Sequence, residues 1–63
     1  MSKPDDCAQI TDEIKQIDED IAGIDEEIRG TTDPVLKARL EREKRVLGLL
    51  LGALLRERRQ LGC

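Results

Sequence analysis

Apolar residues in the first half of the chain follow one narrow, regular stripe. Isoleucine recurs at alternating steps of four and three residues, at Ile10, Ile14, Ile17, Ile21, Ile24 and Ile28. This spacing is the heptad pattern of a helix that packs against another helix along a single seam. Cys7 lies three residues before Ile10 and continues the seam. The pattern therefore predicts an amphipathic helix over residues 3–29, with these isoleucines facing a partner helix.

The second half of the chain predicts another helix, over residues 34–61, with a much broader apolar surface. Its apolar residues include Leu36, Leu40, Leu47, Leu50, Leu51, Leu54 and Leu61, and Val46, Leu49, Ala53 and Leu55 extend the surface around the helix. A helix that is apolar on all sides has to be covered on all sides. The narrow isoleucine stripe of the first helix cannot do this alone, so the pattern predicts self-association.

The segment between the two helices has the signals of a short turn at residues 30–33. Gly30 is expected to end the first helix in the left-handed conformation. Asp33 suits the N-cap of the second helix, and Pro34 suits its first position. So short a connection makes the helices antiparallel neighbours. The predicted fold is all-α, a single antiparallel helical hairpin (αα-hairpin) over residues 1–63 that assembles into a four-helix bundle, most simply as a homodimer.

The surface predicted to mediate self-association lies in the leucine-rich part of the second helix. Its residues are Leu47, Gly48, Leu50, Leu51, Gly52, Leu54 and Leu55. Glycine inside a helix costs about 1 kcal/mol relative to alanine. Gly48 and Gly52 are four residues apart, a spacing that lets another backbone come close. The alternative is that the two glycines relieve crowding among the leucines, and so short a motif does not decide between them.

Composition and charge agree with a small helical assembly. The chain has 63 residues, no aromatic side chain and 40% charged residues, which is typical of coiled coils and long helices. A chain this short has a marginal core of its own unless a disulfide, a metal or a partner supports it. Residues 1–30 hold three basic and ten acidic side chains, a net charge of −7, whereas residues 31–63 hold eight and four, a net charge of +4. This asymmetry suggests that the two halves lie against each other.

The two cysteines raise the question of a disulfide. With a symmetric turn at residues 30–33, residue i is expected beside residue 63 − i, which puts Cys7 level with Arg56. Cys63 would then lie about 10 Å further along the helix axis. The two thiols can meet within one chain only if Gly62 lets the tail fold back. We prefer this intrachain disulfide because both cysteines lie at the open end of the hairpin. The alternatives are two free thiols and a bridge between chains.

The sequence argues against catalysis and against a bound metal or other cofactor. Without histidine there is no ready acid–base group near neutral pH. Asp18, Asp20 and Gly23 match part of a calcium-loop pattern, but Ala22 and Arg29 occupy positions where ligands are required. We interpret these carboxylates as a solvated helical face. The predicted function is a non-enzymatic protein–protein interaction or oligomerisation module, whose partner is itself or another helical protein.

The alternative function is a small nucleic-acid-binding regulator that uses the arginines of the second helix, Arg39, Arg42, Arg45, Arg56 and Arg59. The lack of aromatic side chains and the negative net charge argue against it. A membrane role is also disfavoured, because the apolar run at residues 46–55 would span only about half a bilayer. The N-terminus lacks the order of a secretory signal, so the expected location is the cytoplasm. The caps, the isoleucine seam and the matched helix lengths also agree with the rules of designed hairpins.

Overall fold

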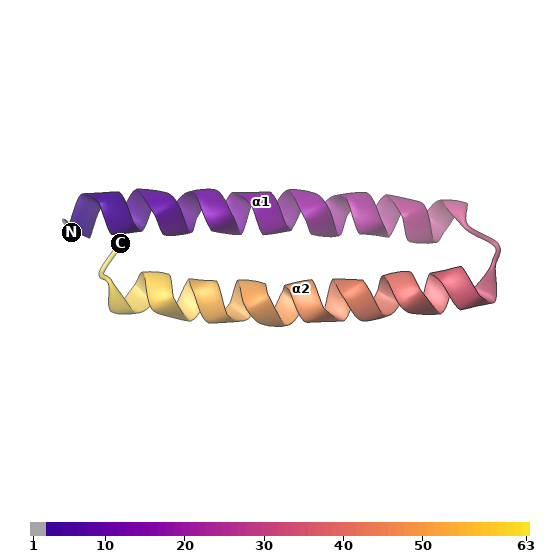
Figure 1. The fold of residues 1–63 in the computed structure, drawn as a ribbon. Helices are drawn as coiled ribbons and strands as arrows, with labels where there is room; N and C mark the ends of the chain where they lie inside the picture. The colour runs from indigo at the N-terminus through magenta and orange to yellow at the C-terminus, as the bar shows by residue number, and fades with distance from the viewer. Residues whose placement is uncertain (1–2) are drawn as a thin grey trace.

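The computed structural model describes residues 3–63, and side chains from residue 5 onward. Two helices, α1 (Lys3–Gly30) and α2 (Pro34–Gln60), pack side by side and antiparallel (Figure 1). The start of α1 and the C-terminus lie at the end of the hairpin opposite the connection. The molecule is a rod with extents of 47 × 14 × 14 Å. The predicted all-α hairpin is confirmed, whereas the four-helix bundle concerns assembly and is taken up below.

The start of α2 follows from the local sequence. The backbone N–H of Val35 donates to the carboxylate of Asp33, with 3.0 Å between the nitrogen and oxygen atoms. Asp33 itself is extended, with φ −80° and ψ 114°, and Pro34 occupies the first turn. This is the geometry of an N-cap, in which a short polar side chain satisfies an N–H group that the helix leaves without a partner.

Replacing Asp33 by alanine should therefore lower the free energy of unfolding by about 1 kcal/mol. Thr32→Ala is the matched control, because Thr32 is exposed in the same connection. Urea unfolding at one fixed chain concentration measures both variants. If the two substitutions had equal effects, the cap would not be the source of the stabilisation.

The expectation for Gly30 was wrong. Gly30 is the last residue of α1 rather than a left-handed residue after it, and the glycine with positive φ in the described chain is Gly62, at 80°. A left-handed residue is needed where the chain turns back onto its own helix. Residues 31–33 instead run outward from the end of α1 before α2 begins (Figure 1), so no such reversal occurs at Gly30.

The same outward path changes the register of the two helices. Two hollows are lined by residues of both helices, and the numbers of the α1 and α2 residues that line the same hollow add on average to about 67 or 68. The ion pair between Asp25 and Lys44 gives a sum of 69. The predicted sum of 63 was therefore wrong by four to six residues. The prediction assumed a symmetric turn, whereas α2 starts beyond the end of α1 (Figure 1).

A disulfide between Cys7, near the start of α1, and Cys63 closes the open end of the hairpin, as preferred from the sequence. The corrected register brings Cys7 level with the end of α2, and the tail covers the remaining distance. Gly62 donates its N–H to the carbonyl of Arg59, and Cys63 donates to the carbonyl of Arg58. This pair of bonds is the Schellman motif, which requires a left-handed residue such as Gly62 at the turn. It directs Cys63 toward α1, where the two Cα atoms lie 5.9 Å apart.

The hydrophobic core of this hairpin is thin. Ile10, Ile14 and Leu40 are the buried apolar side chains of the described residues, with 6–8% of their surface exposed. The other seam isoleucines, Ile17, Ile21, Ile24 and Ile28, are half-buried. Two helices alone can cover only one side of each other. A substantial apolar surface therefore remains open in the single hairpin.

Candidate self-association surface

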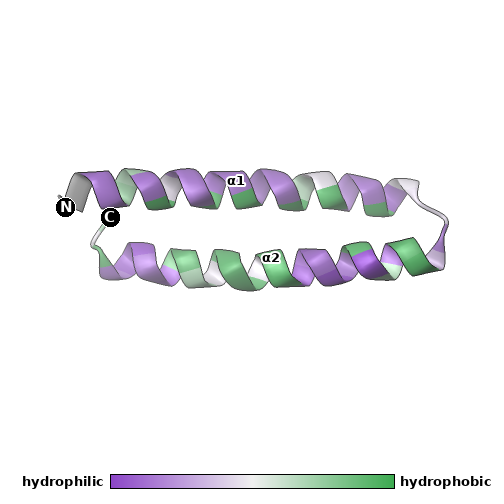
Figure 2. Ribbon diagram, in the orientation of Figure 1, coloured by the Kyte–Doolittle hydropathy of each residue, from purple (hydrophilic) through white to green (hydrophobic). Residues whose placement is uncertain are grey.

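The open apolar surface lies mainly on α2. Val46, Leu49, Leu50 and Leu55 expose between 46% and 71% of their surface. Figure 2 shows the difference between the helices: hydrophobic colour follows the edge of α1 that faces α2, but it surrounds the middle of α2. Val35 and Leu36 add a smaller exposed group near the connection. The seven residues predicted for the interface all lie in this region of α2, but they point to different sides of the helix.

Helix geometry separates those seven residues into three groups. Successive residues are rotated by about 100° around the helix axis. Counted from the buried Leu40, the half-buried residues Leu47, Leu51 and Leu54 point within about 40° of the direction to α1. Leu50 points about 80° to one side. The others, Gly48, Gly52 and Leu55, point about 60–120° to the opposite side.

One side of the hairpin carries an apolar hollow between the helices. Ile17 from α1 and Leu50 and Leu54 from α2 line this hollow, together with Glu13 and Gln16 at its edge. We call this side the groove face. A second hollow, towards the open end, shares Glu13 and is lined by Asp6, Gln9, Ile10, Glu57 and Leu61. The groove face therefore continues along much of the hairpin.

The opposite side of the hairpin carries an ion pair between the two helices. Lys44 of α2 and Asp25 of α1 form an ion pair there, with 45% and 35% of the side chains exposed. A surface ion pair of this kind adds at most about 1 kcal/mol to stability. The groove face differs in carrying apolar side chains from both helices between its polar residues.

The two glycines of α2 lie on the side of this ion pair, and neither has a close neighbour in the hairpin. A Cβ atom added at Gly48 or at Gly52 would meet no other side chain or helix within 4 Å. Packing against α1 therefore does not require glycine at either position, and crowding within the hairpin does not require it either. A close approach at these positions would have to come from a second chain.

Gly48→Ala should raise the free energy of unfolding by up to about 1 kcal/mol, because alanine is the better helix former and nothing in the hairpin obstructs it. Urea unfolding at fixed chain concentration measures the change. A loss of stability would show that the backbone of another chain occupies the space beside Gly48.

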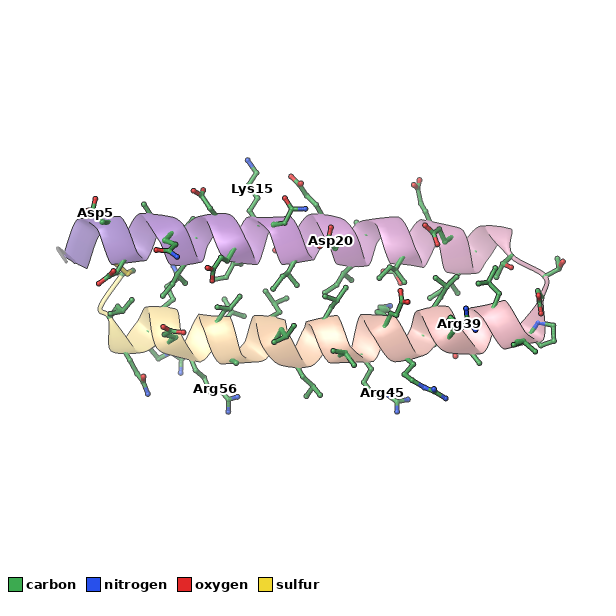
Figure 3. All side chains as sticks on the ribbon, viewed as in Figure 1. Asp5, Lys15, Asp20, Arg39, Arg45 and Arg56 are labelled. Carbon is green, nitrogen blue, oxygen red and sulfur yellow. A yellow bond between two sulfur atoms is a disulfide. The ribbon has the colours of Figure 1, made fainter. Side chains whose placement is uncertain are left out.

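The arginines proposed for nucleic-acid binding do not form a continuous row. Arg45 and Arg56 point away from α1 (Figure 3). They are about 16 Å apart along the helix, and the exposed Leu49 lies between them. Arg39 and Arg42 lie near the connection, beside Val35. This spacing breaks the basic surface into two short clusters.

Two other kinds of site were considered for the described part of the chain, a metal centre and a membrane-spanning segment. Residues 5–63 contain no group of three or more histidine, cysteine, aspartate or glutamate residues arranged to hold a metal ion. Asp18, Asp20 and Gly23 lie inside α1 rather than in a loop. Neither described helix has the length and apolar character needed to cross a membrane. No protein-family model, curated protein or solved structure matches the chain.

Proposed function

We propose that this chain is a non-enzymatic oligomerisation module that self-associates through α2, with a homodimer as the simplest assembly. The observation that carries the proposal is the exposure of the leucine-rich stretch in the single hairpin. Val46 and Leu50 are each at least half exposed. Soluble monomers rarely leave a large contiguous apolar patch in water. A second hairpin would cover this patch and enlarge a core that now holds three buried side chains.

The distribution of charge supports a second copy as the partner. α1 is acidic and α2 is basic, so each hairpin offers a complement for both helices of another. Complementary charge directs association and excludes wrong partners more than it adds affinity. Another helical protein with a similar face is the alternative partner.

The module function is tested by fusing the chain to a monomeric carrier protein. The fusion should sediment with twice the mass of one fusion chain, and it should remain dimeric at moderate salt because apolar burial drives the contact. A monomeric fusion would refute the proposal. A low-salt mobility shift with nucleic acid that disappears as salt is raised would instead favour the nucleic-acid-binding alternative.

The disulfide is relevant to the cellular compartment in which the proposed module functions. Structural disulfides persist in oxidising compartments and are rare in the reducing cytoplasm. The bridge between Cys7 and Cys63 therefore favours an oxidising compartment over the cytoplasm expected from the sequence. Trapping the free thiols of the chain in its native cells tests this: blocked thiols support an oxidising location, and two reactive thiols support the cytoplasm.

A further inference from the structure

We infer that a second copy of this chain docks on the groove face with its connection at the same end of the rod, so that α1 of each copy lies over α2 of the other. The inference rests on the proposed self-association and specifies its geometry. It has two parts: the face that is used, and the direction in which the second copy lies.

The choice of face follows from the apolar residues that turn toward it. On α2, Leu50 and Val46 are rotated by about 80° and 120° from the buried Leu40. On α1, Ile17 and Ile24 are rotated by about 60° and 80° from the buried Ile14. Ile17 and Leu50 line the same hollow, which shows that both rotations lead to the same side. Both helices therefore contribute apolar side chains to the groove face.

The opposite side is a poor alternative because α1 turns none of its isoleucines toward it, and docking there would also bury the ion pair between Lys44 and Asp25. Removing charged groups from water can cost more than their attraction returns. The outer surface of α2, beyond the groove face, offers mainly Leu49 among the arginines. A single exposed leucine is normal on a protein surface and does not require a partner.

Two stackings bring the groove faces of two copies together. In the first, the connections lie at opposite ends, α1 lies over α1 and α2 over α2. In the second, the connections lie at the same end, and α1 of each copy lies over α2 of the other. Every helix has antiparallel neighbours in both arrangements, so helix direction does not distinguish them.

Charge distinguishes the two stackings. α1 carries three basic and ten acidic residues, a net charge of −7, and α2 carries eight basic and three acidic residues, a net charge of +5. An acidic row seven residues apart, Asp6, Glu13, Asp20 and Glu27, lies toward the groove face. The first stacking sets this row against its own copy. The second sets it against the side of α2 that carries Arg39 and Arg42 together with Glu43 and Glu57, so the acidic row meets no net negative charge there.

Near the connection, the register predicts which charged residues face each other in the second stacking. Because facing residue numbers add to about 67–69, Glu27 of one copy would lie level with Arg42 and close to Arg39 of the other. Glu43 and Glu57 also lie toward this side of α2 and offset the two arginines, so the second stacking removes the repulsion of row against row without pairing every charge. Charge here sets the orientation, and apolar contact supplies the affinity.

The arrangement is tested by pulsed electron-spin distance measurement on the oxidised chain, with a spin label on a noncanonical residue at position 32 so that the native cysteines stay paired. Thr32 is exposed in the connection. The inferred stacking predicts one distance below roughly 25 Å between the two labels, since neighbouring helix axes lie about 10 Å apart. The other stacking predicts a distance close to the 47 Å length of the rod.

A label at position 15 is the control. Lys15 lies near the middle of α1 and points away from α2 (Figure 3), so both stackings leave its two labels at a comparable separation. A signal at position 15 with a long distance at position 32 would overturn the inferred stacking and leave self-association intact. No signal between labels at either position would overturn both the stacking and the proposed function.

Discussion

The proposed homodimer should dissociate into monomers when Leu50 is replaced by glutamate. Leu50 is half exposed in the hairpin, where a carboxylate at this position can still reach water. In the proposed homodimer the same position would lie against the second copy, where an unpaired charge would lose its hydration. The expected effect is at least about a hundredfold weaker association, or roughly 3 kcal/mol. Sedimentation velocity across a concentration series measures it.

Leu49→Glu is the matched control for Leu50→Glu. The two leucines are adjacent on α2, and Leu49 is the more exposed at 71%. Leu49 points about 100° away from Leu50, beyond the groove face, so its replacement should leave association nearly unchanged. If both variants dissociated, the outer surface of α2 would be part of the contact. If neither dissociated, the leucine-rich stretch would not mediate self-association.

Breaking the disulfide between Cys7 and Cys63 should lower the free energy of unfolding by about 4 kcal/mol. The bond closes a loop across a sequence separation of 56 residues, and a loop of this size restricts the unfolded chain by about that amount. The loss is large for a hairpin with three buried apolar side chains. Urea unfolding of the oxidised chain, with and without reductant, measures the change at a fixed concentration.

The double variant Cys7→Ala, Cys63→Ala provides the control for reduction. Its stability should resemble that of the reduced chain, and reductant should not alter it further. Equal midpoints for the oxidised and reduced chain would contradict the prediction and show that the disulfide contributes little to folding.

The elements of the fold were predictable because each has a local cause. The isoleucine heptads, the Asp33 cap and the short connection each act through residues close in sequence, and together they determine two antiparallel helices. The disulfide was also predictable, because Gly62 offers the reversal that the tail requires. The helix boundaries differ from the prediction by one residue at Gly30 and one at Gln60.

The register and the grouping of the interface residues could not be predicted in the same way. The register of the two helices depends on the path of residues 31–33, which run outward past Gly30. The turn signals predict where the helices end and begin, but they do not predict this path. The list of apolar residues in α2 also does not show which side of the hairpin each of them faces. Counting about 100° per residue from Leu40 separates Leu50 from Leu55, but that count needs a buried reference residue that the structure supplied.

Sedimentation equilibrium of the oxidised, unmodified chain tests the central claim most directly. Self-association predicts a mass approaching twice the 7.1 kDa of one chain as the concentration rises to about 100 µM. Circular dichroism on the same samples reports whether the helices are intact. A fully helical species that keeps a mass of 7.1 kDa over the whole series would contradict the claim, because the exposed leucines of α2 would then need no partner.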